Sequence, residues 1–192
     1  MKRFSTERFF CFTVVMAIAA LLTACTKQYA NEPGAESRLA GNDASSDHSN
    51  AVFKYHDVGS QTLWELNQAR AATAQYREIK NAFRDGYVDI NVVVPNMGYH
   101  FMKSALVDAV FDYKHPEILV YNKNLDGSFE LLAVEYAVPI AVTPDVAPEG
   151  FTGSDDVWER NTDFGLWLQH AWIWSFNPDG VFHDTNPLIT VN

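Results

Sequence analysis

Three ionisable residues stand in stretches of the sequence that are otherwise apolar: His100 in "MGYHF", Glu135 in "LLAVEYAVP" and His170 in "LWLQHAWIW". Side chains alternate between the two faces of a β-strand, so Glu135 and His170 share their faces with apolar residues. A charge in such surroundings costs free energy unless it is paired or hydrogen-bonded. We therefore expect His100, Glu135 and His170 to converge on the face of a sheet that lines a pocket.

Such a convergence allows three kinds of chemistry. Two neutral imidazoles and one carboxylate form a metal site of the two-His-one-carboxylate type, which suits Zn²⁺ or Fe²⁺ and leaves coordination positions open. The three groups could instead form a buried polar network, in which Glu135 accepts a hydrogen bond from one histidine. They could also act as general acid and base on a bound ligand. The sequence has no compact ligand pattern such as HExxH, so all three interpretations stay open.

Two further residues, Trp172 and Asp184, are candidates for ligand binding. Asp184 lies in "FNPDGVFHDTNP", residues 176–187, where Asn-Pro and Asp-Gly pairs also indicate turns. The tryptophans could form a stacking platform for a sugar or an aromatic ligand, although aromatic residues at alternate strand positions usually belong to the core. These tryptophans are Trp158, Trp167, Trp172 and Trp174. The sequence contains no GxSxG elbow, P-loop, dinucleotide fingerprint or CxxCH haem motif.

The N-terminus resembles the signal peptide of a bacterial lipoprotein. Basic residues at positions 2, 3 and 8 precede the apolar residues 9–22, a stretch shorter than the ~20 residues that span a bilayer. The stretch ends in "LTAC". This resemblance implies cleavage before Cys25, with a diacylglycerol on its thiol and a further acyl chain, such as palmitate, on its amine. Two or more chains anchor a protein stably. Thr26, rather than Asp, follows Cys25, and in the sorting pattern of Gram-negative lipoproteins this implies the outer membrane. The alternative is an ordinary signal peptide or a membrane anchor that contains a cysteine.

Cysteine usage and charge exclude several classes of function. Cys11 and Cys25 are the only cysteines, so the chain after cleavage has neither a disulfide nor a thiolate site. The whole chain carries a formal charge of −10, and loss of residues 1–24 removes three basic residues and one acidic residue. An acidic protein repels nucleic acid and anionic lipid. We therefore expect no nucleic-acid partner, and expect membrane contact through the lipid on Cys25.

The composition divides the chain into three parts. Residues 1–24 are the predicted signal peptide, and residues 25–60 are predicted to be a lipidated flexible tether because they are rich in Ala, Ser, Asn, Gly and Asp. Residues 61–192 have the size and apolar content of a single domain.

The residue pattern in the domain predicts an α+β fold. "TLWE", residues 62–65, is a capping-box pattern, and apolar residues then recur every three or four positions up to Gly86, which predicts one long N-terminal helix. β-branched and aromatic runs predict strands at 87–94, 117–121, 128–138, 164–176 and 188–191. A short helix at 104–112, turns at 124–128 and 177–180, and a long acidic loop at 142–163 complete the expectation. Helix first and strands after favour a mainly antiparallel sheet with the helix packed on it.

Four motifs together resemble a group of uncharacterised exported bacterial proteins. The motifs are "MGYHF", "HPEILVY", "LLAVEYAVP" and "LQHAWIWSFNPDGVFHDTNP", and the similarity covers roughly residues 70–188. The resemblance implies that five residues lie in recurring motifs of the group: His100, Glu117, Glu135, His170 and Asp184. It implies no activity. Thr185 departs from the tryptophan or asparagine found near the final NP of many members, which leaves the role of that position open.

These observations predict a lipid-anchored cell-envelope protein that binds a small ligand or a metal ion in a pocket at His100, Glu135 and His170. One alternative is a metal-dependent or acid/base enzyme that uses the same three residues. Another is a structural envelope lipoprotein without a catalytic site.

Overall fold

The computed structural model describes residues 51–52 and 54–191. The predicted signal peptide, Cys25 and most of the predicted tether lie outside these residues. Three of the four helical elements precede the strands. The four are α1 (Ser60–Thr73), the 3₁₀ turn η2 (Ala74–Arg77), α2 (Ile79–Arg84) and, after the second strand, the 3₁₀ turn η3 (Ser104–Leu106).

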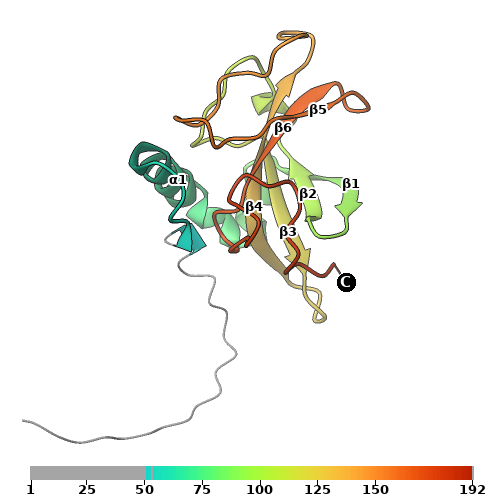
Figure 1. The fold of residues 1–192 in the computed structure, drawn as a ribbon. Helices are drawn as coiled ribbons and strands as arrows, with labels where there is room; N and C mark the ends of the chain where they lie inside the picture. The colour runs from blue at the N-terminus through green and yellow to red at the C-terminus, as the bar shows by residue number, and fades with distance from the viewer. Residues whose placement is uncertain (1–50, 53, 192) are drawn as a thin grey trace, which may run out of the picture. The chain divides into compact units, whose positions relative to one another are not determined.

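Six strands form one antiparallel sheet in the order β1-β2-β3-β4-β6-β5. The strands are β1 (Val88–Val94), β2 (Gly98–Met102), β3 (Ile118–Lys123), β4 (Phe129–Pro139), β5 (Glu159–Asn161) and β6 (Leu166–Ala171). In Figure 1, α1 lies to one side of β3, β4 and β6, and the β1–β2 hairpin lies to the other. The predicted α+β class, the antiparallel sheet and the helix packed on it are confirmed.

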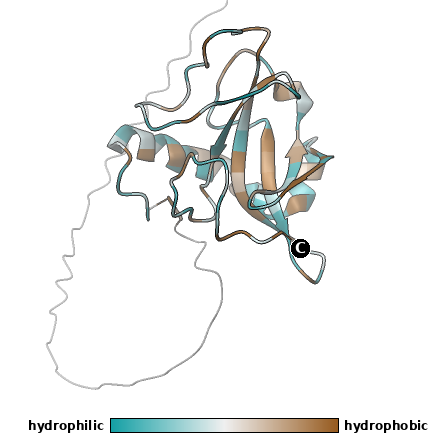
Figure 2. Ribbon diagram, turned by 45° about the vertical axis from the view of Figure 1, so that its right-hand side comes forward, coloured by the Kyte–Doolittle hydropathy of each residue, from teal (hydrophilic) through white to brown (hydrophobic). Residues whose placement is uncertain are grey.

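The two faces of the sheet have different surroundings. Leu119 and Val134 pair across β3 and β4 and pack in the same core as Leu66 and Ala69 of α1. The neighbouring residues along each strand point to the opposite face. Figure 2 shows the apolar residues, in brown, gathered along the central strands. The sheet therefore has one face covered by α1 and a second face that carries His100, Glu135 and His170.

The prediction of one long helix from Thr62 to Gly86 is wrong. The helix ends at Thr73, and Glu78 then has an extended backbone with φ −91° and ψ 103°. Tyr76 is buried, and its carbonyl oxygen accepts a hydrogen bond of 2.7 Å from the Tyr121 hydroxyl on the sheet. The contact with the sheet competes with helix continuation, which the apolar spacing alone cannot show.

The capping box also does not form, because Gly59 is the N-cap residue of α1. The side chains of Thr62 and Glu65 bind Thr152 in the acidic loop instead. The two side chains that the capping box would have used therefore form long-range hydrogen bonds to the loop.

Several strand predictions need correction. β6 ends at Ala171, because the Trp174 and Ser175 amides both donate to the Leu132 carbonyl oxygen and the chain leaves the ladder. Residues 188–191 form no strand, and the predicted helix at 104–112 is reduced to η3. The three-residue β5 lies in what was expected to be loop. The predicted strand at 87–94 forms as β1, which is an edge strand with mostly exposed residues.

The predicted tether ends earlier than residue 60. Val52 and Tyr55 belong to the hydrophobic core, with 0% and 7% of their surface exposed. The Tyr55 hydroxyl donates to the Trp172 carbonyl oxygen at 3.0 Å and accepts from the Asn177 amide at 2.9 Å. The domain therefore includes at least part of residues 51–60. No helix within the described ranges is long and apolar enough to cross a bilayer.

Candidate functional site

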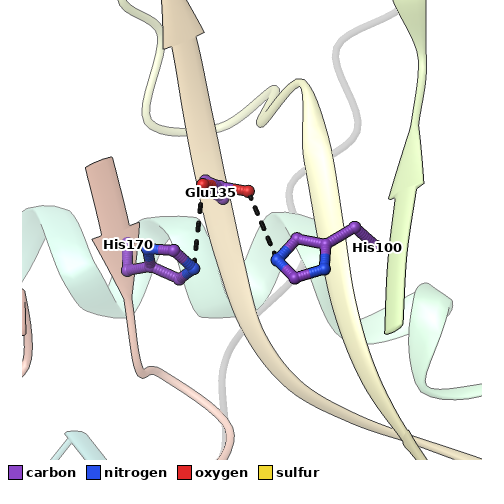
Figure 3. Close-up of side chains that lie close together, drawn as sticks. All are labelled: His100, Glu135 and His170. Carbon is purple, nitrogen blue, oxygen red and sulfur yellow. Dashed lines mark ion pairs between the residues drawn. The ribbon is translucent and has the colours of Figure 1, made fainter. Parts of the chain in front are cut away.

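The structure brings His100, Glu135 and His170 together. Glu135 on β4 lies directly opposite His170 on β6, and His100 reaches the same place from β2, across β3. His100 Nε2 is 3.8 Å and His170 Nε2 is 3.7 Å from the two oxygens of Glu135 (Figure 3). One possible ligand atom from each residue lies within 4.8 Å of the other two. The predicted convergence is confirmed, and we call these three residues the trio.

The backbone fixes which nitrogen of His100 faces the trio. His100 Nδ1 lies 3.1 Å from the Val92 carbonyl oxygen, and a carbonyl oxygen can only accept a hydrogen bond. Nδ1 therefore carries the proton in the neutral ring, and the lone pair of Nε2 points toward Glu135. A metal-binding histidine is commonly oriented in this way, with its other nitrogen donating to a carbonyl oxygen.

An irregularity in β1 supplies that carbonyl. The register between β1 and β2 shifts between Asp89 and Val93, so that residues 90–92 bulge opposite His100. Asn91 in the bulge has a left-handed backbone with φ 56°, and its amide donates to Asp89 Oδ1 at 2.7 Å. β-Bulges occur often beside functional sites, where they redirect individual groups.

A close approach of β2 and β3 also depends on Gly98. Gly98 has φ 137°, and a Cβ atom at this position would overlap the Tyr121 carbonyl oxygen. Glycine at position 98 thus allows the Tyr121 carbonyl group to approach the backbone closely. The strand that carries His100 can therefore lie against β3 only with glycine at position 98.

Burial keeps the trio uncharged near neutral pH. Burial, together with the charges of Glu159 and Asp184, raises the pKa of Glu135 to about 8. Burial lowers the pKa of His100, and it lowers the pKa of His170 to about 3 with a further contribution from His100. The two contacts would be ion pairs only with protonated imidazoles, and these pKa directions favour neutral ones. We therefore describe the trio as three neutral groups.

The three side chains of the trio are also not hydrogen-bonded to one another. The contacts of 3.7 and 3.8 Å exceed the usual hydrogen-bond length, and His170 Nε2 has no partner among the described residues. A divalent cation binds nitrogen and oxygen ligands at about 2.0–2.2 Å, which places ligand atoms roughly 3–4.4 Å apart. The trio has nearly this spacing. It presents two imidazole lone pairs and one carboxyl group to a common point.

A cavity of about 220 Å³ lies beside the trio. Residues of both edge strands contribute to its wall, so the sheet curls around it. Apart from the trio, Glu159 and Asn161, the lining is apolar: Ile90, Val92, Val94, Met97, Met102, Ile118, Phe164, Leu166 and Leu168. A small molecule could therefore reach the trio in surroundings that exclude most water.

The other predicted ligand-binding residues lie outside this cavity. Trp172 is fully buried, stacks on the His170 ring with centroids 6.1 Å apart, and donates from Nε1 to the His183 carbonyl oxygen. Its contact with the trio is therefore the packing against the His170 ring. Asp184 is half-buried, and its charge contributes to the raised pKa of Glu135.

Two acidic residues near or beneath the site were not predicted to have a role there. Glu159 lines the cavity from β5, a strand too short to show an alternating pattern. Glu117 is buried on the α1 face and accepts a hydrogen bond of 3.0 Å from the Ala137 amide. Its position among apolar residues in "HPEILVY" was the available signal.

Comparisons with protein-family models, with curated proteins and with solved structures find no match for this chain. The interpretation of the site therefore depends on its own geometry. The resemblance to exported bacterial proteins stays a prediction.

Proposed function

We propose that this chain is a lipid-anchored cell-envelope protein that binds a divalent metal ion, Zn²⁺ or Fe²⁺, at His100, Glu135 and His170. The observation that carries the proposal is the placement of three possible ligand atoms within 4.8 Å of one another. The hydrogen bond from His100 Nδ1 to the Val92 carbonyl oxygen supports it, because that bond leaves Nε2 free to coordinate.

The alternative of a purely structural polar network fits the same atoms less well. A buried polar group without a partner costs about 1–3 kcal/mol, so a structural network is expected to be closed by hydrogen bonds. The trio leaves both Glu135 contacts longer than a hydrogen bond and His170 Nε2 without a partner in the described part of the chain. A bound cation would satisfy all three groups at once.

A metal-dependent or acid/base enzyme is the second candidate function. The apolar cavity of about 220 Å³ beside the trio favours an enzyme, because it gives a small substrate access to the three polar groups. A purely structural lipoprotein does not need such access. Three protein ligands leave one or more coordination positions for water or substrate. The geometry does not select a reaction.

Metal titration of the purified protein tests the proposal. We expect one equivalent of Zn²⁺ to bind, and Glu135→Gln or His170→Gln to weaken binding by about 100-fold or more, since each removes one of three ligands. Glu117→Gln is the matched control, because Glu117 is an equally buried carboxyl on the other face of the sheet. Stoichiometric binding that neither trio substitution weakens would contradict the proposed site, as would the absence of binding to the unaltered protein.

A further inference from the structure

A second hollow lies along the acidic loop, with a volume of about 580 Å³. Its walls come from the loop itself, and we call it the loop groove. The lining residues are Ala147, Pro148, Glu149, Gly150, Phe151, Thr152, Gly153, Asp156 and Trp158. None of them belongs to the trio or to the lining of its cavity.

Hydrogen bonds to α1 fix the middle of the loop that forms the groove. Glu65 of α1 accepts hydrogen bonds from the Thr152 amide at 2.8 Å and from the Thr152 hydroxyl at 2.6 Å. The Thr62 hydroxyl donates to the Thr152 carbonyl oxygen. Because the middle of the loop is fixed in this way, a ligand would bind to a preformed surface and lose less free energy in ordering it.

The polar side chains of Asp156, Trp158 and Gln169 converge beside Gly150, on the side where another residue would carry its Cβ atom. A Cβ atom on Gly150 would lie 2.9 Å from Trp158 Nε1 and 3.0 Å from Gln169 Oε1, and it would overlap a carboxylate oxygen of Asp156. Gly150, Asp156 and Trp158 all line the loop groove. Gln169 lies on β6 at the back of this wall, because it alternates with His170 and points to the opposite face of the sheet.

The converging groups lack hydrogen-bond partners. Gln169 is fully buried, and neither its Oε1 nor its Nε2 has a partner among residues 51–52 and 54–191. The buried Trp158 Nε1 is likewise without one in this range. Buried donors and acceptors are nearly always satisfied in folded proteins. This cluster therefore has the character of a binding site that offers both donors and acceptors.

The chemistry of these groups selects the class of ligand. Glu149 and Asp156 place carboxylates in the groove, which repel anions and accept hydrogen bonds from hydroxyl groups. An ammonium ion could pair with the carboxylates but offers no acceptor to the indole N–H group of Trp158. A hydroxyl group donates and accepts. The indole ring of Trp158 adds an apolar surface that suits the C–H face of a sugar ring.

We propose that the loop groove binds a neutral saccharide, with Trp158 and Asp156 as the recognising residues and Gln169 in the wall behind them. This site is separate from the trio and does not depend on a metal. Of the four tryptophans considered from the sequence as a stacking platform, only Trp158 lines the groove. Trp167, Trp172 and Trp174 are buried in the fold.

Binding of sugars to the purified protein tests this proposal. Glucose, N-acetylglucosamine and cellobiose would be titrated to millimolar concentrations, with tryptophan fluorescence and amide NMR shifts as readouts. We expect at least one to bind and to shift amides in residues 149–158. Trp158→Phe keeps an aromatic ring but removes the N–H donor, and we expect it to weaken binding about tenfold. Trp64→Phe is the matched control, because Trp64 is 49% exposed on α1 and lies outside the groove.

Two further variants test the groove. Asp156→Asn, at the groove surface, should weaken binding without disturbing the core, which keeps the test independent of folding. Gly150→Ala, whose Cβ would overlap Asp156, should abolish binding. The proposal is overturned if none of the three sugars binds, if tetramethylammonium binds in their place, or if Trp64→Phe weakens binding as much as Trp158→Phe. Binding that persists unchanged in both Gly150→Ala and Asp156→Asn would overturn it as well.

Discussion

Glu117 directly precedes β3, whose first residue Ile118 pairs with Glu135, so the two carboxyl groups lie on opposite faces. Burial raises the pKa of each to about 8. The two carboxyl groups have different partners. Glu117 accepts a hydrogen bond from the Ala137 amide, whereas Glu135 faces two imidazoles at more than hydrogen-bond distance. The raised pKa of Glu117 thus accompanies a structural hydrogen bond, whereas the similar pKa of Glu135 accompanies a set of possible metal ligands. The pKa alone therefore does not identify the site.

The raised pKa of Glu117 predicts how stability depends on pH. In the unfolded chain this carboxyl ionises above about pH 4.5, but in the fold it keeps its proton up to about pH 8. Its contribution to stability is complete below pH 4.5 and is lost as the pH rises toward 8, at about 1.4 kcal/mol per pH unit at most. Glu117→Gln cannot ionise, so its free energy of unfolding should fall less steeply between pH 5 and 8. Urea unfolding at several pH values measures this, and parallel curves for the two proteins would contradict it.

The bulge in β1 determines how His100 is oriented. Asn91 needs a left-handed backbone, which asparagine tolerates and β-branched residues do not. We expect Asn91→Gly to keep the bulge and the affinity for Zn²⁺. Asn91→Val should flatten the bulge, displace the Val92 carbonyl group and weaken Zn²⁺ binding about tenfold or more.

Asn96→Val is the control for this prediction. Asn96 also has a left-handed backbone, with φ 61°, but it lies in the β1–β2 turn and not opposite His100. Its substitution should lower the melting temperature by a similar amount and leave the affinity for Zn²⁺ intact. Equal losses of affinity in both valine variants would show that strain in the hairpin, and not the position of the Val92 carbonyl group, controls the site.

The elements also show how far the sequence alone predicts the site. Alternation along β4 and β6 was enough to place Glu135 and His170 on a face with apolar neighbours, because that rule is local. The hydrogen bond of His100 depends on a bulge in another strand, and the contribution of Glu159 depends on a three-residue edge strand. Both are consequences of strand pairing across the sheet. The break after α1 has the same origin, since the Tyr76 carbonyl oxygen is bound by Tyr121 on β3.

Residues before α1 contribute to the fold of the domain. Tyr55 bonds to the backbone at Trp172 and Asn177 and packs on Phe176, with ring centroids 5.3 Å apart. Tyr55→Phe would leave a buried carbonyl oxygen and a buried amide without this partner, so we expect a loss of roughly 1–3 kcal/mol in the free energy of unfolding. A fragment that begins at Ser60 should be less stable still. Chemical unfolding of the two variants and the full chain measures the difference, and equal stability would contradict this role of Tyr55.

The anchoring of the molecule makes a prediction of its own, for Cys25, which lies outside the described residues. If the "LTAC" sequence directs lipid attachment, Cys25→Ser removes the only thiol that could carry it after cleavage. Removal of the signal by the lipoprotein route requires the lipidated cysteine, so the variant should carry no palmitate and should keep residues 1–24. Radioactive palmitate labelling and the mass of the protein from bacterial cells measure both effects, with Cys11→Ser as the control because Cys11 lies in the predicted signal peptide. The control should be labelled like the unaltered protein. A Cys25→Ser protein that still incorporates palmitate would exclude the lipoprotein anchor.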